Sequence, residues 1–225
     1  MGKNMLSYQH VQVPSEICKK VKTKENLVYA VIRMHMNKET QESFPSMDTI
    51  ASLAKLSKAT VNNAIRSLEK DGHIIIKKRG RCNVYTFKSF DKKFERFTFD
   101  FIKSLDLDPE LKSYIMGSFP NSYKDSELAI SCVSDLQLSN ELGISARSIA
   151  RYDTKLEENH IMTKLRSKVK DPSTGLYNYI RAYDMVPVLQ SILYVNEKTD
   201  KNTEDIEQLK KEVRELRQLL SEHNE

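Results

Sequence analysis

A pattern of side chains in residues 57–69 recurs 88 positions later, and this repeat limits what a chain of 225 residues can fold into. Both copies contain a serine, a hydroxyl residue three positions on, a β-branched residue and a Leu-Glu pair. These are Ser57, Thr60, Val61, Leu68 and Glu69 in the first copy, and Ser145, Ser148, Ile149, Leu156 and Glu157 in the second. After a one-residue deletion, His73-Ile74 also matches His160-Ile161. Because repeated sequence implies repeated structural units, we expect two similar domains.

The first copy predicts three helices followed by a β-hairpin. Apolar residues recur at helical spacing in 25–38, again after Ser46 and again after Ser57, and both serines suit the N-cap position. Gly72 stands where a helix ends in a left-handed residue. Two runs, HIIIKK and NVYTFK, then predict strands joined by a turn.

The second copy predicts the same order of elements. One helix begins at Pro109 after Asp108, a second covers 134–142, and Gly143 separates it from a helix capped by Ser145. Two strands follow around the loop KDPSTG. We therefore predict a mostly α fold with small β-hairpins (α+β), made of domains 1–92 and 109–195 joined by a connecting helix over 93–108.

The last 30 residues differ in charge and pattern from the rest. Residues 196–203 have the polarity of a linker, and 204–225 predict a helix with apolar residues spaced 3, 4, 3 and 4 apart. This spacing favours a short parallel coiled coil and hence a homodimer, although the helix could instead fold back on its own domain. The apolar positions are Ile206, Leu209, Val213, Leu216 and Leu220.

Composition excludes several classes of function. Three distant cysteines and five histidines show no metal-ligand spacing, and six isolated glycines form no phosphate-binding loop, so we expect no enzyme, no cofactor and no metal. No apolar run reaches the ~20 residues of a membrane span. We expect a cytoplasmic protein with no membrane association. The formal net charge is +5, and the last 30 residues carry nine acidic and six basic side chains, so the positive charge lies in residues 1–195.

Polar and basic residues cluster at the start of the second helix of each short helix pair. One helix fits the major groove of B-DNA, and its first turn must offer directional donors and acceptors to the bases. We therefore predict contacts with the bases of double-stranded DNA, while Val61, Ile65, Leu68, Ile149 and Leu156 hold the helices on their cores. The predicted base-reading residues are Ser57, Lys58, Thr60, Asn62, Asn63, Arg66, Arg147, Ser148, Arg151 and Tyr152.

The strands that follow each predicted reading helix carry a second basic group. We expect it to contact the phosphate backbone, which adds affinity without sequence information. Tyr177, Tyr179 and Tyr183 alternate in the last strand, where packing against a helix is the commoner role and base stacking the alternative. The predicted backbone contacts are Lys77, Lys78, Arg79, Arg81, Lys164, Arg166, Lys168 and Lys170.

Residues 44–80 resemble the winged helix-turn-helix of replication-initiation proteins of plasmids and phages, and of related helix-turn-helix regulators. The shared pattern is F-P-S, a short helix, S-x-x-T-V and L-E-x-x-G-x-I. Lys55 departs from it where the family often has glycine. The resemblance implies an initiator that binds iterated origin sites and contacts replication proteins such as a helicase. The matching residues are Phe44, Pro45, Ser46, Ser57, Thr60, Val61, Leu68, Glu69, Gly72 and Ile74.

Other interpretations of the same residues stay open. Ser57 and Ser145 could cap helices as well as contact DNA, and the basic hairpin could be an ordinary solvated surface. The second unit lacks the F-P-S opening and could bind protein instead. The chain could also be a transcriptional repressor or regulator, an accessory factor in DNA transfer or segregation, or an interaction module that does not touch DNA.

Overall fold

All the residues described belong to one compact unit, residues 1–193. The predicted linker over 196–203 and the predicted coiled coil over 204–225, with its five apolar positions, lie outside the described residues. The computed structural model describes residues 10–80, 82–88, 93–103, 107–124, 128–170, 172 and 175–184.

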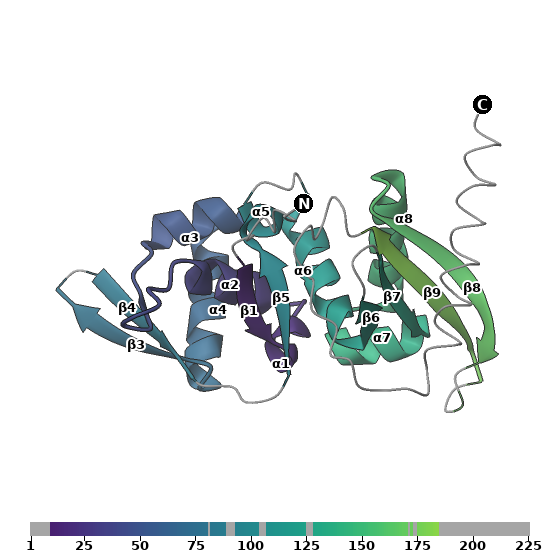
Figure 1. Ribbon diagram of the computed structural model, residues 1–225, viewed down its shortest axis with the longest axis horizontal. Coiled ribbons are helices and arrows are strands. Elements are labelled where there is room, and N and C mark those ends of the chain that lie inside the picture. The colour runs from purple at the N-terminus through teal and green to yellow at the C-terminus, as the bar shows by residue number, and fades with distance from the viewer. Residues whose placement is uncertain are drawn as a thin grey trace, which may run out of the picture. The chain divides into compact units, whose positions relative to one another are not determined.

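The first half of the described chain, residues 10–103, combines helices with two small sheets (Figure 1). Strands β2, β4 and β3 form one antiparallel sheet in that order, and β1 pairs with β5 in the other. The elements are β1 (His10–Pro14), α1 (Ser15–Cys18), α2 (Glu25–Met34), β2 (Glu42–Ser43), α3 (Met47–Ala54), α4 (Lys58–Lys70), β3 (Ile74–Arg79), β4 (Cys82–Phe87), β5 (Phe94–Thr98) and α5 (Phe99–Lys103).

The second half, residues 107–184, repeats part of this order. Its sheet runs β6-β7-β9-β8, so β7, β9 and β8 take the places of β2, β4 and β3, and β6 is an added edge strand. The elements are α6 (Pro109–Ser118), a 3-10 turn η1 (Phe119–Asn121), β6 (Ser122–Lys124), β7 (Leu128–Val133), α7 (Asp135–Leu142), α8 (Ala146–Glu158), β8 (Met162–Lys170) and β9 (Tyr177–Asp184).

The predicted helices and hairpins of both halves are confirmed, but the connecting helix over 93–108 is wrong for its first part. Residues 94–98 form strand β5, which pairs antiparallel with β1 from Pro14 opposite Phe94 to His10 opposite Thr98. Only α5 is helical in the described part of that segment. The sequence did not predict this strand, because it pairs with a segment about 80 residues earlier and local sequence patterns do not reveal pairing between distant segments. With β1, β5, β6 and β7 the fold is mixed α/β, richer in strand than predicted.

The two halves keep the offset of 88 beyond the helices, so the predicted one-residue deletion is also wrong. At the end of α4, the Gly72 N–H donates to the Glu69 carbonyl and the His73 N–H to the Leu68 carbonyl, both at 2.9 Å. At the end of α8, the His160 N–H donates to the Glu157 carbonyl and the Ile161 N–H to the Leu156 carbonyl, also at 2.9 Å. These acceptors lie 88 positions after Glu69 and Leu68. Gly72 (φ 73°) and His160 (φ 56°) are the left-handed residues of these caps. His160 therefore corresponds to Gly72 and not to His73.

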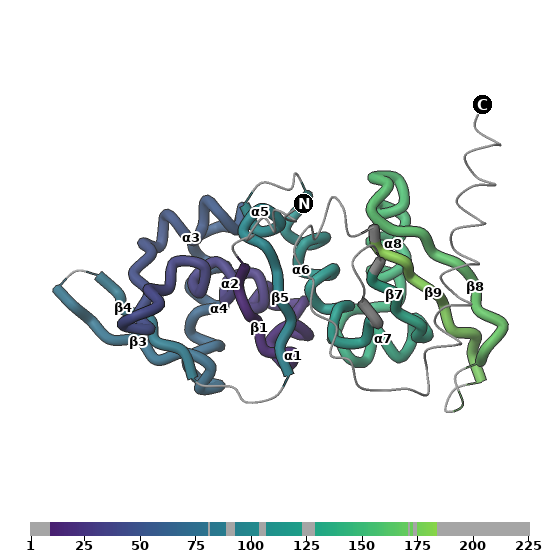
Figure 2. The backbone as a smooth tube through the Cα atoms, viewed as in Figure 1, coloured from purple at the N-terminus to yellow at the C-terminus, as the bar shows by residue number. Residues whose placement is uncertain are grey.

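The halves are joined by close packing of α6 against α1 and α2 (Figure 2). Asn26 Nδ2 donates to the Ser113 carbonyl at 2.9 Å, and Ser113 Oγ lies 2.6 Å from Asn26 Oδ1, all of it buried. Gly117 permits the approach, because a Cβ there would lie 2.3 Å from Val21 Cγ2 and 3.0 Å from Leu142 Cδ2. Buried apolar residues of both halves form one continuous core. The two predicted reading helices, α4 and α8, are thus built on a common scaffold.

Candidate nucleic-acid interface

Helices α3 and α4 form the helix pair predicted in the first half. Ser46 Oγ accepts the Thr49 N–H at 3.0 Å, and Ser57 Oγ accepts the Thr60 N–H at 3.1 Å, so both predicted N-caps are confirmed. Lys55 forms the turn between the helices in the left-handed conformation, with φ 52° and ψ 40°. One face of α4 is buried as predicted and anchors the helix, through Val61, Ala64, Ile65 and Leu68.

The opposite face of α4 presents polar side chains to solvent. Lys58, Asn63 and Arg66 are exposed, while Thr60 and Asn62 are half-buried. Asn63 and Arg66 are three residues apart, so they are neighbours on one side of the helix. Lys58 forms an ion pair with Asp48 at the start of α3, and both side chains remain largely exposed. This face therefore offers amide and guanidinium groups from a helix whose other side is fixed in the core.

The serine that begins α4 is occupied in capping. Beyond accepting the Thr60 N–H, Ser57 Oγ lies 2.9 Å from Thr60 Oγ1. Ser145 repeats the arrangement with Ser148, at 3.1 Å to its N–H and 2.9 Å to its Oγ. Of the two roles considered for these serines, the structure shows capping. Ser57 is still exposed, so the position of its hydroxyl is compatible with a ligand as well.

The far end of α4 is held by a chain of ion pairs. Lys20, between α1 and α2, contacts both Asp71 at the C-cap of α4 and the buried Glu25, whose Oε2 lies 3.0 Å from Lys20 Nζ. Burial lowers the pKa of Lys20, but its hydrogen bonds to Asp71 and Glu25 outweigh that effect and raise the pKa overall. The same contact lowers the pKa of Asp71. Both ends of the exposed helix are therefore fixed by capping or charged contacts.

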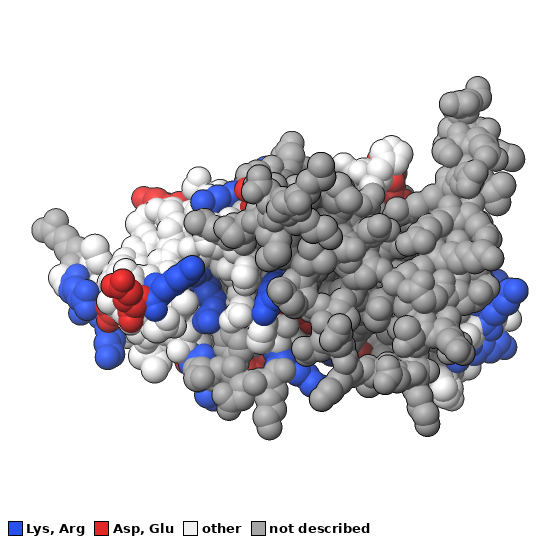
Figure 3. All heavy atoms as spheres, in the orientation of Figure 1, with Lys and Arg blue, Asp and Glu red and all other residues white. Residues whose placement is uncertain are grey.

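The β3–β4 hairpin carries the basic group predicted beside α4. Lys77 and Lys78 are exposed, whereas Arg79 Nη2 donates to Glu42 Oε2 on β2 at 3.2 Å. The Arg79 guanidinium also lies 5.5 Å from the centroid of the Phe44 ring. Arg81 lies outside the described residues. On the face shown in Figure 3, Lys and Arg side chains gather over this hairpin and at the outer end of the β8–β9 hairpin, with acidic side chains beside the β3–β4 hairpin.

In the second half, α8 exposes fewer of the predicted reading residues. Arg147 and Arg151 are exposed and Ser148 is half-buried. The prediction that Tyr152 reads bases is wrong, because its side chain is buried and its ring packs against Tyr114 with 5.4 Å between centroids. Position 152 corresponds to the buried Ala64 of α4, so the repeat itself already placed it on the core face.

Strand β8 also divides the residues predicted to contact the backbone. Arg166, Lys168 and Lys170 are exposed. The prediction that Lys164 contacts a phosphate is wrong, because its side chain points into the domain. Its Nζ lies 2.7 Å from Asp153 Oδ2 and 3.1 Å from Asp135 Oδ2, and only 15% of its side chain is exposed. Two carboxylates already compensate its charge, which makes it unavailable to a phosphate.

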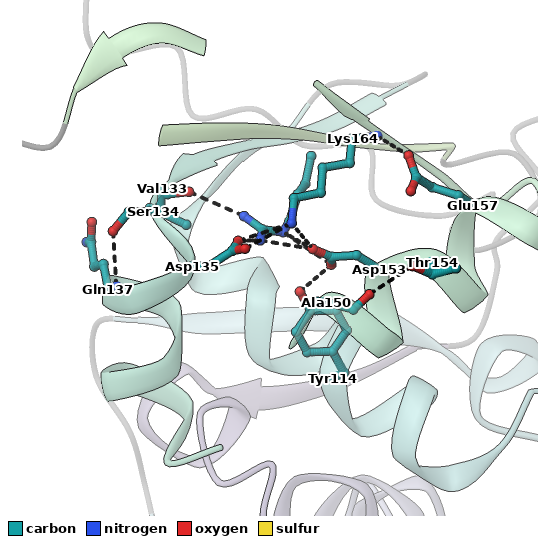
Figure 4. Close-up of polar contacts among 11 residues, drawn as sticks. Tyr114, Val133, Ser134, Asp135, Gln137, Ala150, Asp153, Thr154, Glu157 and Lys164 are labelled. Atoms are coloured by element: carbon teal, nitrogen blue, oxygen red, sulfur yellow. Dashed lines mark hydrogen bonds and ion pairs between the residues drawn. The ribbon is translucent and has the colours of Figure 1, made fainter. Parts of the chain in front are cut away.

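Lys164 belongs to a buried charged cluster that was not predicted, formed with Asp135, Asp153, Arg181 and Tyr114 (Figure 4). Arg181, fully buried on β9, donates through Nε and Nη2 to Asp153 at 3.0–3.2 Å and through Nη1 to the Val133 carbonyl at 3.3 Å. It also contacts Asp135. The Tyr114 hydroxyl donates to Asp153 Oδ1 at 2.6 Å, and burial raises the pKa of this tyrosine well above its usual value. The cluster ties α8 to α6, α7 and the β8–β9 hairpin.

Comparison with known proteins identifies the first helix pair. Residues 21–74 match the family model of a helix-turn-helix domain, a range that runs from Val21 through α2, α3 and α4 to the first residue of β3. The first half thus carries a helix-turn-helix domain. A search of curated proteins gave no match. Among the described residues, no helix combines the length and the apolar character needed to cross a membrane.

Proposed function

We propose that this protein binds double-stranded DNA in a sequence-specific manner and acts as a binding protein rather than an enzyme. The observation that carries the proposal is the exposed face of α4, with Asn63 and Arg66 side by side, inside a region that matches a helix-turn-helix domain. Asparagine pairs with adenine and arginine with guanine through two hydrogen bonds each in the major groove. A helix capped at one end and ion-paired at the other supplies such groups in a fixed orientation.

The basic hairpin supplies the second element of the proposal. Lys77 and Lys78 are exposed, and neither has an acidic partner among the residues that the structure describes. We assign them to the phosphate backbone, where they add affinity that falls steeply with salt. Arg79 contributes less in this scheme, because Glu42 already balances its charge.

The second half extends the proposal to tandem winged helices. Its helices α7 and α8 and its strand β8 keep the offset of 88 from the first half, and its sheet has β9 in the place of β4. Arg147 and Arg151 are the exposed basic residues on α8 that would meet DNA. A rigid pair of such units suits iterated or palindromic sites, because the joint between α6 and α2 fixes their spacing.

Among DNA-binding proteins, we favour a plasmid or phage replication initiator, on the resemblance carried by Phe44 to Ile74. A transcriptional regulator of the same architecture would use the same surfaces. Origin melting or helicase recruitment by the purified protein favours the initiator, whereas promoter occupancy without replication activity favours the regulator. We also propose that residues 204–225 mediate a homodimer, which sedimentation of a chain ending at Asn196 tests: unchanged dimerisation would exclude that segment as the cause.

The proposal is tested by selecting bound fragments from random DNA and measuring variants on the selected site and on unrelated duplex. Asn63→Ala should weaken binding to the selected site by about 1–3 kcal/mol and leave binding to unrelated duplex nearly unchanged. Lys78→Ala should weaken both alike and reduce the salt slope by about one. Lys22→Ala, an exposed lysine outside both elements, is the matched control. Equal losses on both duplexes for Asn63→Ala and Lys78→Ala, or no binding at low salt, would contradict the assignment.

A further inference from the structure

We infer that the outer end of the β8–β9 hairpin is a separate site that binds an unpaired strand of nucleic acid, with Tyr177 as its stacking platform. This site goes beyond duplex recognition by α4 and the β3–β4 hairpin. It lies on the part of the hairpin that extends beyond α8 (Figure 1). Its residues come from β8 and β9, in the half that the helix-turn-helix match does not cover.

The site is built from cations placed over tyrosine rings. The Arg166 guanidinium lies 3.9 Å from the centroid of the Tyr177 ring, and Lys170 Nζ lies 4.9 Å from it. Further in, Lys164 Nζ lies 4.2 Å from the centroid of Tyr179. Arg166 is opposite Tyr179 and Lys170 is opposite Tyr177 in the strand register, so these side chains share one face of the hairpin.

The same face changes character along its length. At the inner end Tyr183 is buried in the core, Tyr179 is half-buried, and Tyr177 at the outer end is 37% exposed. The packing role considered for the alternating tyrosines therefore holds for Tyr183 but accounts less well for Tyr177. A ring that only braced the hairpin would gain from burial, yet more than a third of Tyr177 stays in contact with water.

The charge of the described residues around Tyr177 is positive. Arg166, Lys168 and Lys170 are exposed and have no acidic partner within the described ranges. Lys164, two residues before Arg166, shows the contrast, because Asp135 and Asp153 neutralise it. Two of these cations lie over an exposed ring and the third, Lys168, is between them on the same strand, which matches the chemistry of a polyanion that also carries flat apolar groups.

A single strand fits this surface better than a duplex. Bases in a duplex already stack on one another, whereas unpaired bases can place their faces on a tyrosine ring, which is worth about 1–3 kcal/mol per base. Successive phosphates can then contact Arg166, Lys168 and Lys170. The exposed Val169 and Leu176 at the same end add apolar contact surface for the sugars and bases. An acidic protein segment could meet the same cations, and the experiment below separates it through the requirement for bases.

The absence of tryptophan from the chain gives a direct test. In full-length protein, Tyr177→Trp places a single fluorophore on the platform while keeping an aromatic surface. Titration with a 20-nucleotide thymidine strand should quench its emission in a saturable way, because bases stack on the indole. An abasic strand of the same length and charge should bind more weakly and leave the emission nearly unchanged.

The matched control is Phe44→Trp in the first half. Phe44 is also exposed and also lies under an arginine, Arg79. Arg79 is ion-paired to Glu42, so the cation over this ring is already neutralised. Its tryptophan emission should not respond to the strand. Tyr177→Ala should lower affinity for the thymidine strand by about tenfold or more, with the thermal unfolding temperature and the affinity for the selected duplex unchanged.

Several results would overturn the inference. One is that the native protein and Tyr177→Ala bind the thymidine strand with equal affinity. Another is that the thymidine strand does not change the emission of Tyr177→Trp, and a third is that the abasic strand quenches it equally. Equal loss of duplex and single-strand binding in Tyr177→Ala would assign the hairpin to duplex contact instead. Because Asn63→Ala is expected to impair only the selected duplex, failure of this site and failure of duplex recognition give different results.

Discussion

Four positions beneath the two exposed helices are apolar in the first half of the molecule and charged in the second. Two of the positions are on the two short helices and two are on the β-hairpin. At each position, the residue of the first half and its counterpart in the second half are buried to a similar degree. The pairs are Met47 and Asp135, Ile65 and Asp153, Ile76 and Lys164, and Tyr85 and Arg181.

The difference shows that one backbone arrangement tolerates two kinds of core. In the first half Ile65 and Tyr85 join the apolar core, which stabilises α4 without a preferred direction. In the second half Asp153 and Arg181 are as deeply buried, and each carries several charge-assisted hydrogen bonds. The charges of the cluster balance, with two carboxylates and two cations. Because hydrogen bonds are directional and apolar packing is not, these contacts add a geometric constraint between α8 and its hairpin that the first half lacks at the same positions.

The largest expected effect comes from breaking the charged cluster on one side only. Asp153→Ala should lower the free energy of unfolding by about 3–5 kcal/mol, because among the described residues the fully buried Arg181 would keep Asp135 and the Val133 carbonyl as its hydrogen-bond partners and lose the carboxylate that carries most of its contacts. Denaturant unfolding of the full chain measures it. A loss below about 2 kcal/mol would mean that the cluster matters less than its burial indicates.

Replacing the whole cluster by the residues of the first half is the matching control. Asp135→Met, Asp153→Ile, Lys164→Ile and Arg181→Tyr are combined with Tyr114→Phe, which removes a hydroxyl that would lose its acceptor. Exchange of a buried ion cluster for apolar residues is commonly neutral or stabilising by about 1–4 kcal/mol. The combined variant should therefore be more stable than Asp153→Ala. The reverse order would show that the two cores are not interchangeable.

The joint between the halves is the next most sensitive position. Gly117→Ala should cost about 1–3 kcal/mol, because its Cβ would lie 2.3 Å from Val21 Cγ2 on a buried, β-branched side chain. Thermal unfolding measures the loss. Val21→Ala in the same chain should recover part of it by making room. An unchanged melting temperature for Gly117→Ala would show that the halves can shift apart freely.

The turns between the paired helices offer a reciprocal exchange. Lys55 and Gly143 correspond, and both are left-handed, with φ 52° and 62°. Gly143→Lys should destabilise by about 1 kcal/mol through backbone strain alone, since nothing lies within 4 Å of its Cβ position. Lys55→Gly should stabilise by up to about 1 kcal/mol for the same reason. Changes of the same sign in both variants would show that the two turns are not equivalent.

An effect no larger than those of the turns is expected at Glu141, where the first half has Leu53 at the corresponding position. Glu141 accepts from Lys19 Nζ at 2.7 Å, Asn121 Nδ2 at 2.6 Å and Gln137 Nε2 at 3.1 Å. Burial raises the pKa of this carboxyl, but the three hydrogen bonds outweigh it and lower the pKa below its ordinary 4.5. Its contribution to stability is therefore present above pH 4.5 and is lost as the pH falls through the lowered pKa.

Glu141→Gln accordingly should cost about 1 kcal/mol at neutral pH. The difference from the native protein should shrink as the pH falls below about 4.5. Unfolding curves recorded from pH 7 to pH 3 measure it. The exposed Glu158→Gln serves as the control and should leave stability unchanged at each pH. A difference that stays constant with pH would remove the charge of Glu141 as the cause.

Much of the fold follows from local sequence. Ser46, Ser57 and Ser145 marked the starts of helices, and the apolar faces of α4 and α8 were confirmed, because capping and 3.6-residue periodicity are local properties. The pairing of β1 with β5 was missed, since a strand pair between distant segments leaves no mark in either one. The predictions for Tyr152 and Lys164 were wrong because a polar or basic residue can face the core when the fold places a suitable contact there. Tyr152 packs against Tyr114, and Lys164 forms ion pairs with Asp135 and Asp153.

By itself the sequence determined the repeat, the helix boundaries and the surplus of basic residues, since each depends on neighbours a few positions apart. Only the tertiary structure decided which of those basic residues stay free. Lys164 and Arg79 meet carboxylates brought from other elements, whereas Arg166, Lys168 and Lys170 meet none among the described residues. The reason is physical: the charge that a ligand encounters is the sum over groups close in space, and folding sets that proximity.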